Sequence, residues 1–193
     1  MVPSPPNAQS MTAARFESVA LPFMEALYRK ALHLTRQQHD ASDLVQETFL
    51  RAFRNFASFT EGTNCKAWLF TIQYSIFVNK YRKTQREPQT VSIDEFEAVL
   101  VDENWDADFA TLSSAALDWQ EPEVSAALGQ LPEEFRAAIL LVDVEELSYE
   151  EAAGVLACPV GTLRSRLARA RRALFITLRD YARSRGFLRG GTA

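Results

Sequence analysis

Residues 148–174 read "SYEEAAGVLACPVGTLRSRLARARRAL", and this stretch decides which fold the chain is expected to adopt. Ser148 stands three residues before Glu151, which is the pattern of a capping box and marks the start of a helix. "ACPVG" (157–161) ends that helix, and a longer helix rich in arginine follows from about Gly161. A short helix, a tight turn and a longer basic helix together predict a helix-turn-helix.

The longer helix is expected to bury one apolar face, because its leucines and alanines repeat at intervals of three and four residues. These residues are Leu163, Leu167, Ala170, Leu174 and Leu178. The remaining face is polar and cationic and fits a major groove, with side chains near base edges and further arginines on phosphates. An ordinary solvated basic face is the alternative. The candidate DNA-binding residues are Thr162, Arg164, Ser165, Arg166, Arg169 and Arg172.

The charge of the chain is divided into blocks, although its formal net charge is only −4. Residues 51–86 carry seven basic side chains against one acid, whereas residues 87–135 hold thirteen Asp and Glu and no Lys or Arg. Residues 164–189 then carry nine arginines against a single acid. Two basic blocks separated by an acidic one indicate two separate contacts with a polyanion.

Helical periodicity continues outside this motif, so the fold is expected to be all-α. Three helices are predicted before residue 87, with Pro22 kinking or splitting the first, Asp40 capping the second and Asn64 capping the third. The second is expected to bury Val45, Phe49, Ala52, Phe53 and Phe56. The chain is divided into a disordered arm (1–12), a helical domain (13–86), an acidic flexible linker (87–122), a second small helical domain containing the helix-turn-helix (123–185) and a tail (186–193).

The first domain interleaves aromatic and cationic side chains near its third helix. This mixture suits single-stranded DNA, because bases stack on rings while cations follow the backbone. The alternative is that most of the rings form the core, which we expect for Phe70 and Phe77. The residues at the junction of loop and helix are expected to be more exposed; the candidates in this region are Phe59, Asn64, Lys66, Trp68, Lys80, Arg82 and Lys83.

Several classes of function are disfavoured by what the sequence lacks. No nucleotide-binding loop, metal-ligand cluster or nucleophile arrangement is recognisable, so we expect no enzymatic activity, no cofactor and no metal. No apolar run is long enough for a bilayer, and the first residues do not form a secretory signal. Cys65 and Cys158 are far apart and indicate two reduced thiols in a cytoplasmic protein, although a redox switch at Cys158 is an alternative.

The two helical blocks resemble one known family. "DASDLVQETFLRAFRNF" (40–56) and "GTNCKAWLFTI" (62–72) are similar to the core-binding and promoter-melting domain of extracytoplasmic-function sigma factors, in the sigma-70 family. "LPEEFRAAILLVDVEELSYEEAAGVLACPVGTLRSRLARARRAL" (131–174) resembles the domain of that family that reads the −35 element. The resemblance covers residues 15–86 and 124–183. It implies a transcription-initiation factor that binds core RNA polymerase, reads −35 as duplex and captures −10 bases as a single strand.

The resemblance also implies roles for individual positions. The loop from Phe59 to Lys66 matches the one that captures an unstacked −10 base, and the helix after it runs along the melted strand through Trp68, Asn79, Lys80, Arg82 and Lys83. Ser75 stands where the family often has Asn, at a position that helps to set the −10 preference. Contacts with the clamp helices of the polymerase match Asp43, Leu44, Gln46, Glu47, Leu50, Arg51 and Arg54.

Further partners are implied by the same resemblance: the polymerase flap, on an apolar surface of the last domain, and an anti-sigma factor. Two rival functions remain open, a stand-alone helix-turn-helix regulator of duplex DNA and a mimic that occupies an anti-sigma factor without using DNA. The acidic linker is expected to follow the polymerase channel that later holds RNA, its carboxylates substituting for phosphates; the alternative is a merely solubilising tether.

Overall fold

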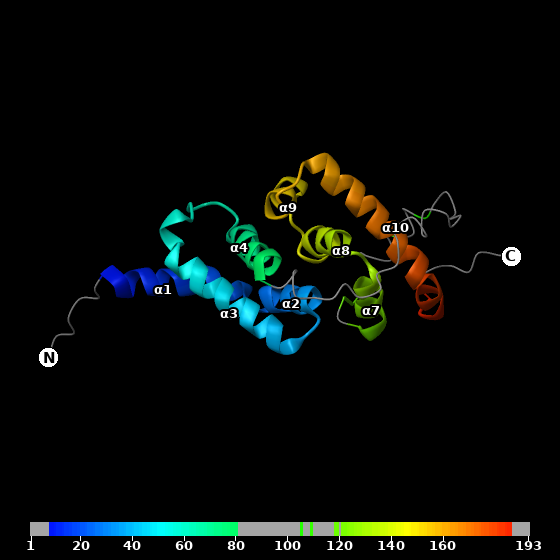
Figure 1. Cartoon of the computed structure of the whole chain (residues 1–193), viewed down its shortest axis with the longest axis horizontal. Helices are drawn as coiled ribbons and strands as arrows, with labels where there is room; N and C mark the ends of the chain where they lie inside the picture. The colour runs from blue at the N-terminus through cyan, green and yellow to red at the C-terminus, as the bar shows by residue number, and fades with distance from the viewer. Residues whose placement is uncertain (1–7, 81–104, 106–108, 110–117, 120, 187–193) are drawn as a thin grey trace. The chain divides into compact units, whose positions relative to one another are not determined.

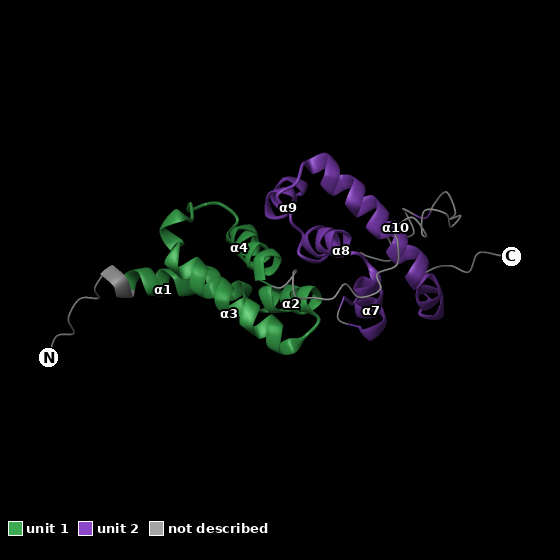
Figure 2. Cartoon of the chain, viewed as in Figure 1, with its two compact units in different colours: residues 1–85 green, residues 86–193 purple. Residues whose placement is uncertain are grey.

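The computed structural model describes residues 8–80, 105, 109, 118–119 and 121–186. Every regular element in these ranges is a helix (Figure 1). The chain divides into two compact units, residues 1–85 and residues 86–193, which Figure 2 colours separately. The expected all-α fold with two small helical domains is confirmed.

Unit 1 is built around α3, which packs against both α2 and α4. Pro22 lies in a short 3-10 turn between the first two helices, so the proline splits the predicted first helix. Asn64 caps α4, because its Oδ1 accepts a hydrogen bond from the Ala67 N–H at 3.2 Å. The helices are α1 (Ala8–Ala20), η1 (Leu21–Phe23), α2 (Met24–Thr35), α3 (Gln38–Arg54), η2 (Phe56–Ser58) and α4 (Cys65–Lys80).

Three sequence expectations for unit 1 differ from the structure. The expected disordered arm does not hold for residues 8–12, because α1 begins at Ala8. The second predicted helix, α3, begins after Gln37, which makes no side-chain capping hydrogen bond. Asp40 therefore lies inside the first turn, where a carboxylate still favours the positive end of the helix dipole. Phe53 was expected to be buried but is 46% exposed, at the end of α3.

The core of unit 1 joins α2 and α4 by polar as well as apolar contacts. Phe70 and Phe77 are fully buried, as predicted. The Gln73 Nε2 donates a 2.8 Å hydrogen bond to the carbonyl of Leu27, which ties α4 to the middle of α2. The ammonium of Lys30, 1% exposed, lies 4.3 Å from the centre of the Phe70 ring, a cation–π contact inside the core.

Unit 2 is organised by its last helix, α10, which packs against α7, α8 and α9. A π-helical turn, η3, continues α8 and leads to the helix-turn-helix formed by α9 and α10. All five predicted stripe residues of α10 are buried, so the periodicity identified the packed face of this helix. The helices are α7 (Pro122–Gln130), α8 (Glu133–Ile139), η3 (Leu140–Val144), α9 (Tyr149–Val155) and α10 (Val160–Ser184).

Most of the segment expected to be a linker, and the tail after Gly186, lie outside the described residues. Two aromatic residues of that segment are nevertheless placed. Phe109 is buried, and the ring of Trp105 lies 6.3 Å from the ring of Phe175 on α10. At Trp105 the segment therefore contacts α10. Among the helices that the structure describes, none combines the length and the apolar character needed to cross a bilayer.

Candidate nucleic-acid and polymerase interfaces

The helix-turn-helix is defined by a capping box at the start of α9 and by the backbone conformation of the turn after it. The Ser148 Oγ accepts from the Glu151 N–H at 3.2 Å, and the Glu151 carboxylate accepts from the Ser148 N–H at 2.9 Å, so the predicted capping box is present. After α9, Ala157 adopts a left-handed conformation (φ 50°), and Pro159 then occupies the extended N-cap position of α10 without a side-chain hydrogen bond. These features fix the position at which α10 begins.

The predicted DNA-binding residues of α10 differ in exposure. Arg164, Ser165 and Arg169 are exposed on the side opposite the buried stripe. The other three, Thr162, Arg166 and Arg172, are half-buried at its edges. The outermost part of the helix therefore presents two guanidinium groups and a hydroxyl, a combination suited to phosphates and base edges.

Arg166 and Arg171 of α10 each pair with an acidic residue elsewhere in unit 2. Arg166 forms an ion pair with Glu134 of α8, and its side chain is only 25% exposed. Arg171 makes a paired contact with Asp143 of η3, with Nε–Oδ2 at 3.0 Å and Nη2–Oδ1 at 2.5 Å. Because Arg171 donates these hydrogen bonds to the Asp143 carboxylate, the pKa of Arg171 is raised and the guanidinium stays charged. Both arginines hold α10 to the rest of the domain.

Tyr149 is a residue of this site that sequence reasoning missed. It is the first residue of α9, and the Arg164 guanidinium carbon lies 5.5 Å from the centre of its ring. The contact joins the two helices of the motif and places one exposed arginine against an aromatic face. The only sequence signal for Tyr149 is its place next to the capping-box serine. Helical spacing does not distinguish it from the residues around it.

The candidate single-strand site begins where the loop after α3 meets α4. The rings of Phe59 and Trp68 are half-buried, with their centres 5.2 Å apart. Lys66 is half-buried, its ammonium 5.9 Å from the Phe70 ring, whereas Asn64 is exposed at the cap. The loop therefore ends on an aromatic pair with polar groups beside it.

Further along α4, the predicted residues share one face. Trp68, Ser75 and Asn79 are separated by seven and four positions, which places them in a row along a helix. Ser75 and Asn79 are exposed, as is Lys80 at the end of the helix. The row extends over about 16 Å at 1.5 Å per residue. Arg82 and Lys83 lie outside the described residues.

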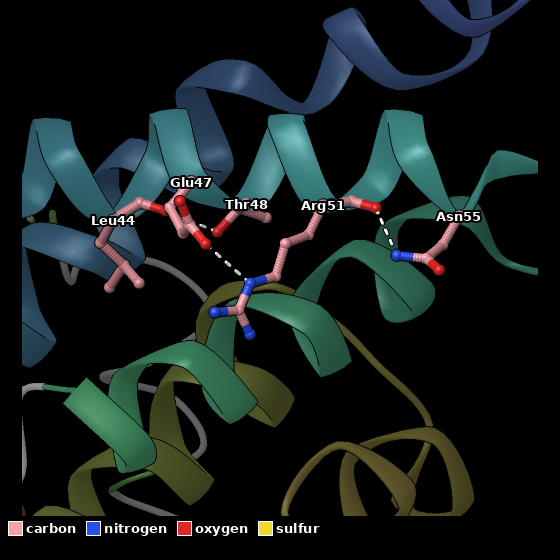
Figure 3. Close-up of polar contacts among 5 residues, drawn as sticks. All are labelled: Leu44, Glu47, Thr48, Arg51 and Asn55. Carbon is pink, nitrogen blue, oxygen red and sulfur yellow. Dashed lines mark hydrogen bonds and ion pairs between the residues drawn. The ribbon is translucent and has the colours of Figure 1, made fainter.

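The candidate polymerase-binding residues occupy one side of α3, with one exception. Gln46, Leu50, Arg51 and Arg54 are exposed, and Asp43 and Glu47 are half-buried. Figure 3 shows Glu47 and Arg51 joined by an ion pair of 2.7 Å one turn apart. Leu44 is fully buried, because it lies on the same helix face as the core residue Thr48, and therefore packs inside the unit.

An apolar groove beside this side of α3 was not foreseen. Its volume is about 550 Å³, and it lies between the start of α2 and the first half of α3. Leu50 is 52% exposed and Met24 is 48% exposed, so both add apolar surface to this side of unit 1. The groove is lined by Leu21, Pro22, Met24, Glu25, Tyr28, Ser42, Val45 and Gln46.

Comparison with protein families gives two matches, one in each unit. Residues 22–87 match the model described as Sigma-70 region 2, and residues 122–174 match the model described as Sigma-70, region 4. The first match includes the candidate polymerase and single-strand sites. The second includes the helix-turn-helix up to Leu174.

Individual proteins give the same result. The chain is 40% identical over 158 residues to the ECF RNA polymerase sigma factor EcfG of Rhodopseudomonas palustris, covering 79% of this chain and 77% of that protein. It is 38% identical over 157 residues to the ECF RNA polymerase sigma factor SigE of Mycolicibacterium smegmatis, covering 81% of this chain and 57% of that longer protein. The sigma factor RpoE of Bartonella quintana, solved in complex with the anti-sigma factor NepR, is similar with a TM-score of 0.64 and 32% identity, covering 86% of this chain and 97% of that one.

Proposed function

Because the chain belongs to the extracytoplasmic-function sigma factors of the sigma-70 family, we propose that it is an alternative sigma factor, a non-catalytic subunit that directs core RNA polymerase to promoters. The observation that carries the proposal is that the two units present different kinds of binding surface. One presents a cationic helix of a helix-turn-helix, and the other an aromatic pair continued by a polar row on α4. The first arrangement suits duplex DNA, the second an opened strand.

Binding at −35 is assigned to the exposed side of α10. Arg164, Ser165 and Arg169 are the residues proposed to meet the major groove, and the half-buried Thr162 and Arg172 flank them. Arg166 is proposed to take part only when it leaves Glu134, because its guanidinium is already paired. Phosphate contacts would supply most of the affinity and side chains at base edges the preference for sequence.

Opening at −10 is assigned to the loop before α4 and to the row of residues that follows it. Extruding a base costs a few kcal/mol, and stacking on an aromatic ring returns about 1–3 kcal/mol per base. One or two captured bases therefore roughly offset the cost of opening. Phe59 and Trp68 are half-buried, so each keeps part of its ring surface available for a base.

Polymerase binding is assigned to the exposed residues of α3 around Leu50, without Leu44. An exposed leucine between charged neighbours costs little in the free protein and is stabilising when a partner buries it. Since the similar RpoE was solved with an anti-sigma factor, we also propose that a protein of this class holds the present chain inactive. Its place of action would be the cytoplasm, where promoter DNA and polymerase are found.

The test is transcription in vitro with bacterial core polymerase and a library of promoter sequences. The wild-type chain is expected to select templates that share two short elements, and Arg169→Ala is expected to weaken the use of all of them. Association with core is measured separately by size-exclusion chromatography. A chain that never associates with core, but binds an operator by itself, would instead be a stand-alone helix-turn-helix regulator.

A further inference from the structure

Helix α1 lies outside both family matches and has no role in the function proposed above. It is nevertheless packed on the end of α3. Phe16 is 6% exposed, and its ring meets those of Phe49, Phe53 and Phe56 edge-on, at 6.3, 5.2 and 5.3 Å between centres. Such edge-to-face pairs are the favoured arrangement of aromatic rings. Phe16, in the middle of this cluster, is therefore a main packing contact between α1 and the rest of unit 1.

The same cluster continues into the candidate single-strand site. The ring of Phe56 is stacked on that of Phe59 at 6.0 Å with 11° between planes, and it lies 6.4 Å from the ring of Trp68. A continuous series of rings thus runs from Phe16 on α1 to the aromatic pair proposed to receive a base. Because rings in contact move together, a shift of α1 would displace that pair.

Arg15, the neighbour of Phe16, reaches the loop directly. Its guanidinium carbon lies 5.5 Å from the centre of the Phe56 ring, and the group forms an ion pair with Glu61. The loop that carries Glu61 is closed by the Thr63 Oγ1, which donates to the carbonyl of Thr60 at 2.7 Å. Gly62 (φ 83°) provides the left-handed turn that this closure requires.

The ion pair between Arg15 and Glu61 contributes little to the folding stability of unit 1. The side chains of Arg15 and Glu61 are 50% and 75% exposed, and exposed pairs contribute about 0–1 kcal/mol. Glu61 is, however, the single acid among residues 51–86, in the loop that is proposed to face an opened strand. A carboxylate there repels phosphates, and a guanidinium beside it cancels that repulsion.

We propose that α1 holds the loop 59–64 in place and that Arg15 is a positioning residue for capture of the melted strand. Arg15 neutralises Glu61, and Phe16 fixes the ring of Phe56 against which Phe59 is stacked. This inference rests on the proposed function, because it assumes that the loop contacts promoter DNA. It adds a segment before the matched region to the machinery that opens the promoter.

The test uses the full chain with core polymerase and a promoter that wild type opens, with opening followed by permanganate reactivity of thymines in the −10 region. The variants are Arg15→Ala, Glu61→Gln, their double variant, Arg15→Lys and the control Glu17→Gln, which removes an exposed charge from the same helix. Arg15→Ala is expected to slow opening about 3- to 10-fold. Glu61→Gln is expected to open at least as fast as wild type, and the control is expected to be unchanged.

Rescue distinguishes charge neutralisation from general damage. The double variant is expected to open within about twofold of Glu61→Gln, and Arg15→Lys is expected to recover most of the loss, because either restores a loop without net negative charge. The proposal is overturned if Arg15→Ala opens normally, or if its defect persists in full when Glu61 is removed. A wild-type chain that does not bind core or open any promoter overturns the proposed function itself, so the two failures are distinct.

Discussion

Two arginines that lie two positions apart on α10 are expected to respond to truncation in opposite ways. Arg169 is exposed on the proposed DNA side, whereas Arg171 is bound to Asp143, whose side chain is 10% exposed. Because its side chain is exposed, Arg169→Ala should weaken DNA binding and loosen the domain much less than Arg171→Ala. Arg171→Ala should loosen the domain and leave the electrostatic part of DNA binding nearly unchanged, because its charge is already matched inside the protein.

The magnitudes follow from the two environments. One phosphate contact contributes about −0.9 to the slope of log affinity against log salt. Between about 50 and 200 mM salt, DNA affinity falls by a certain factor, and losing this contact makes that factor about 3.5-fold smaller. Removing Arg171 leaves the nearly buried carboxylate of Asp143 without two charged hydrogen bonds, at a cost of about 2 kcal/mol. This corresponds to about 30-fold faster hydrogen exchange at the slowest amides of α10.

The assay measures both quantities on the same proteins. The salt dependence of −35 duplex binding is measured with the holoenzyme, and hydrogen exchange is measured on the free chain by mass spectrometry. Asp143→Asn serves as a matched control, since it weakens the same contact from the other side and should also accelerate exchange. The reasoning is refuted if Arg171→Ala reduces the salt slope as much as Arg169→Ala while the exchange of α10 stays unchanged.

Four further outcomes follow from the same structure. Glu134→Gln should release Arg166 and raise −35 affinity, with a salt slope steeper by up to about 0.9; an unchanged slope would contradict this. Ser148→Ala should cost about 1 kcal/mol in urea unfolding of unit 2, because α9 loses its cap. Leu50→Glu should abolish association with core polymerase in chromatography while leaving the circular dichroism spectrum intact, since Leu50 is exposed. Burial raises the pKa of the Cys65 thiol, so the unfolded chain loses this proton first, and wild-type stability should fall more steeply than that of Cys65→Ala above about pH 8.5.

Local rules in the sequence identified most of the architecture. The spacing of Leu163 and its successors located the buried face of α10, and the positions of Ser148 and Asn64 located two helix starts, because caps and periodicity depend only on neighbours along the chain. The same rules failed at helix ends without a recognisable cap. The start of α1 at Ala8 and of α3 at Gln38 carry no side-chain signal of that kind.

The distribution of roles among the arginines could not be predicted in this way. The partner of Arg171 is 28 positions earlier, and that of Arg166 is on α8, so only the folded domain reveals which guanidinium groups are already engaged. The resemblance to the family likewise assigned Leu44 to the polymerase-binding surface, because it stands within the matching segment. Its burial is decided by the packing of α3 against α2 and α4, which a single helix does not specify.

The tilted contact of the Trp105 ring with the Phe175 ring limits how far apart the two DNA elements can be bound at once. With that ring anchored on α10, only about 25 peptide steps separate Lys80 from Trp105, which permits a reach of at most about 85 Å. Counted to Pro122 instead, about 42 steps would permit about 140 Å. When the promoter spacer is lengthened by whole turns of DNA, about 35 Å each, the wild-type chain should lose transcription at a shorter spacer than Trp105→Ala does. The side chain of Trp105 would then set the longest spacer that the protein can use.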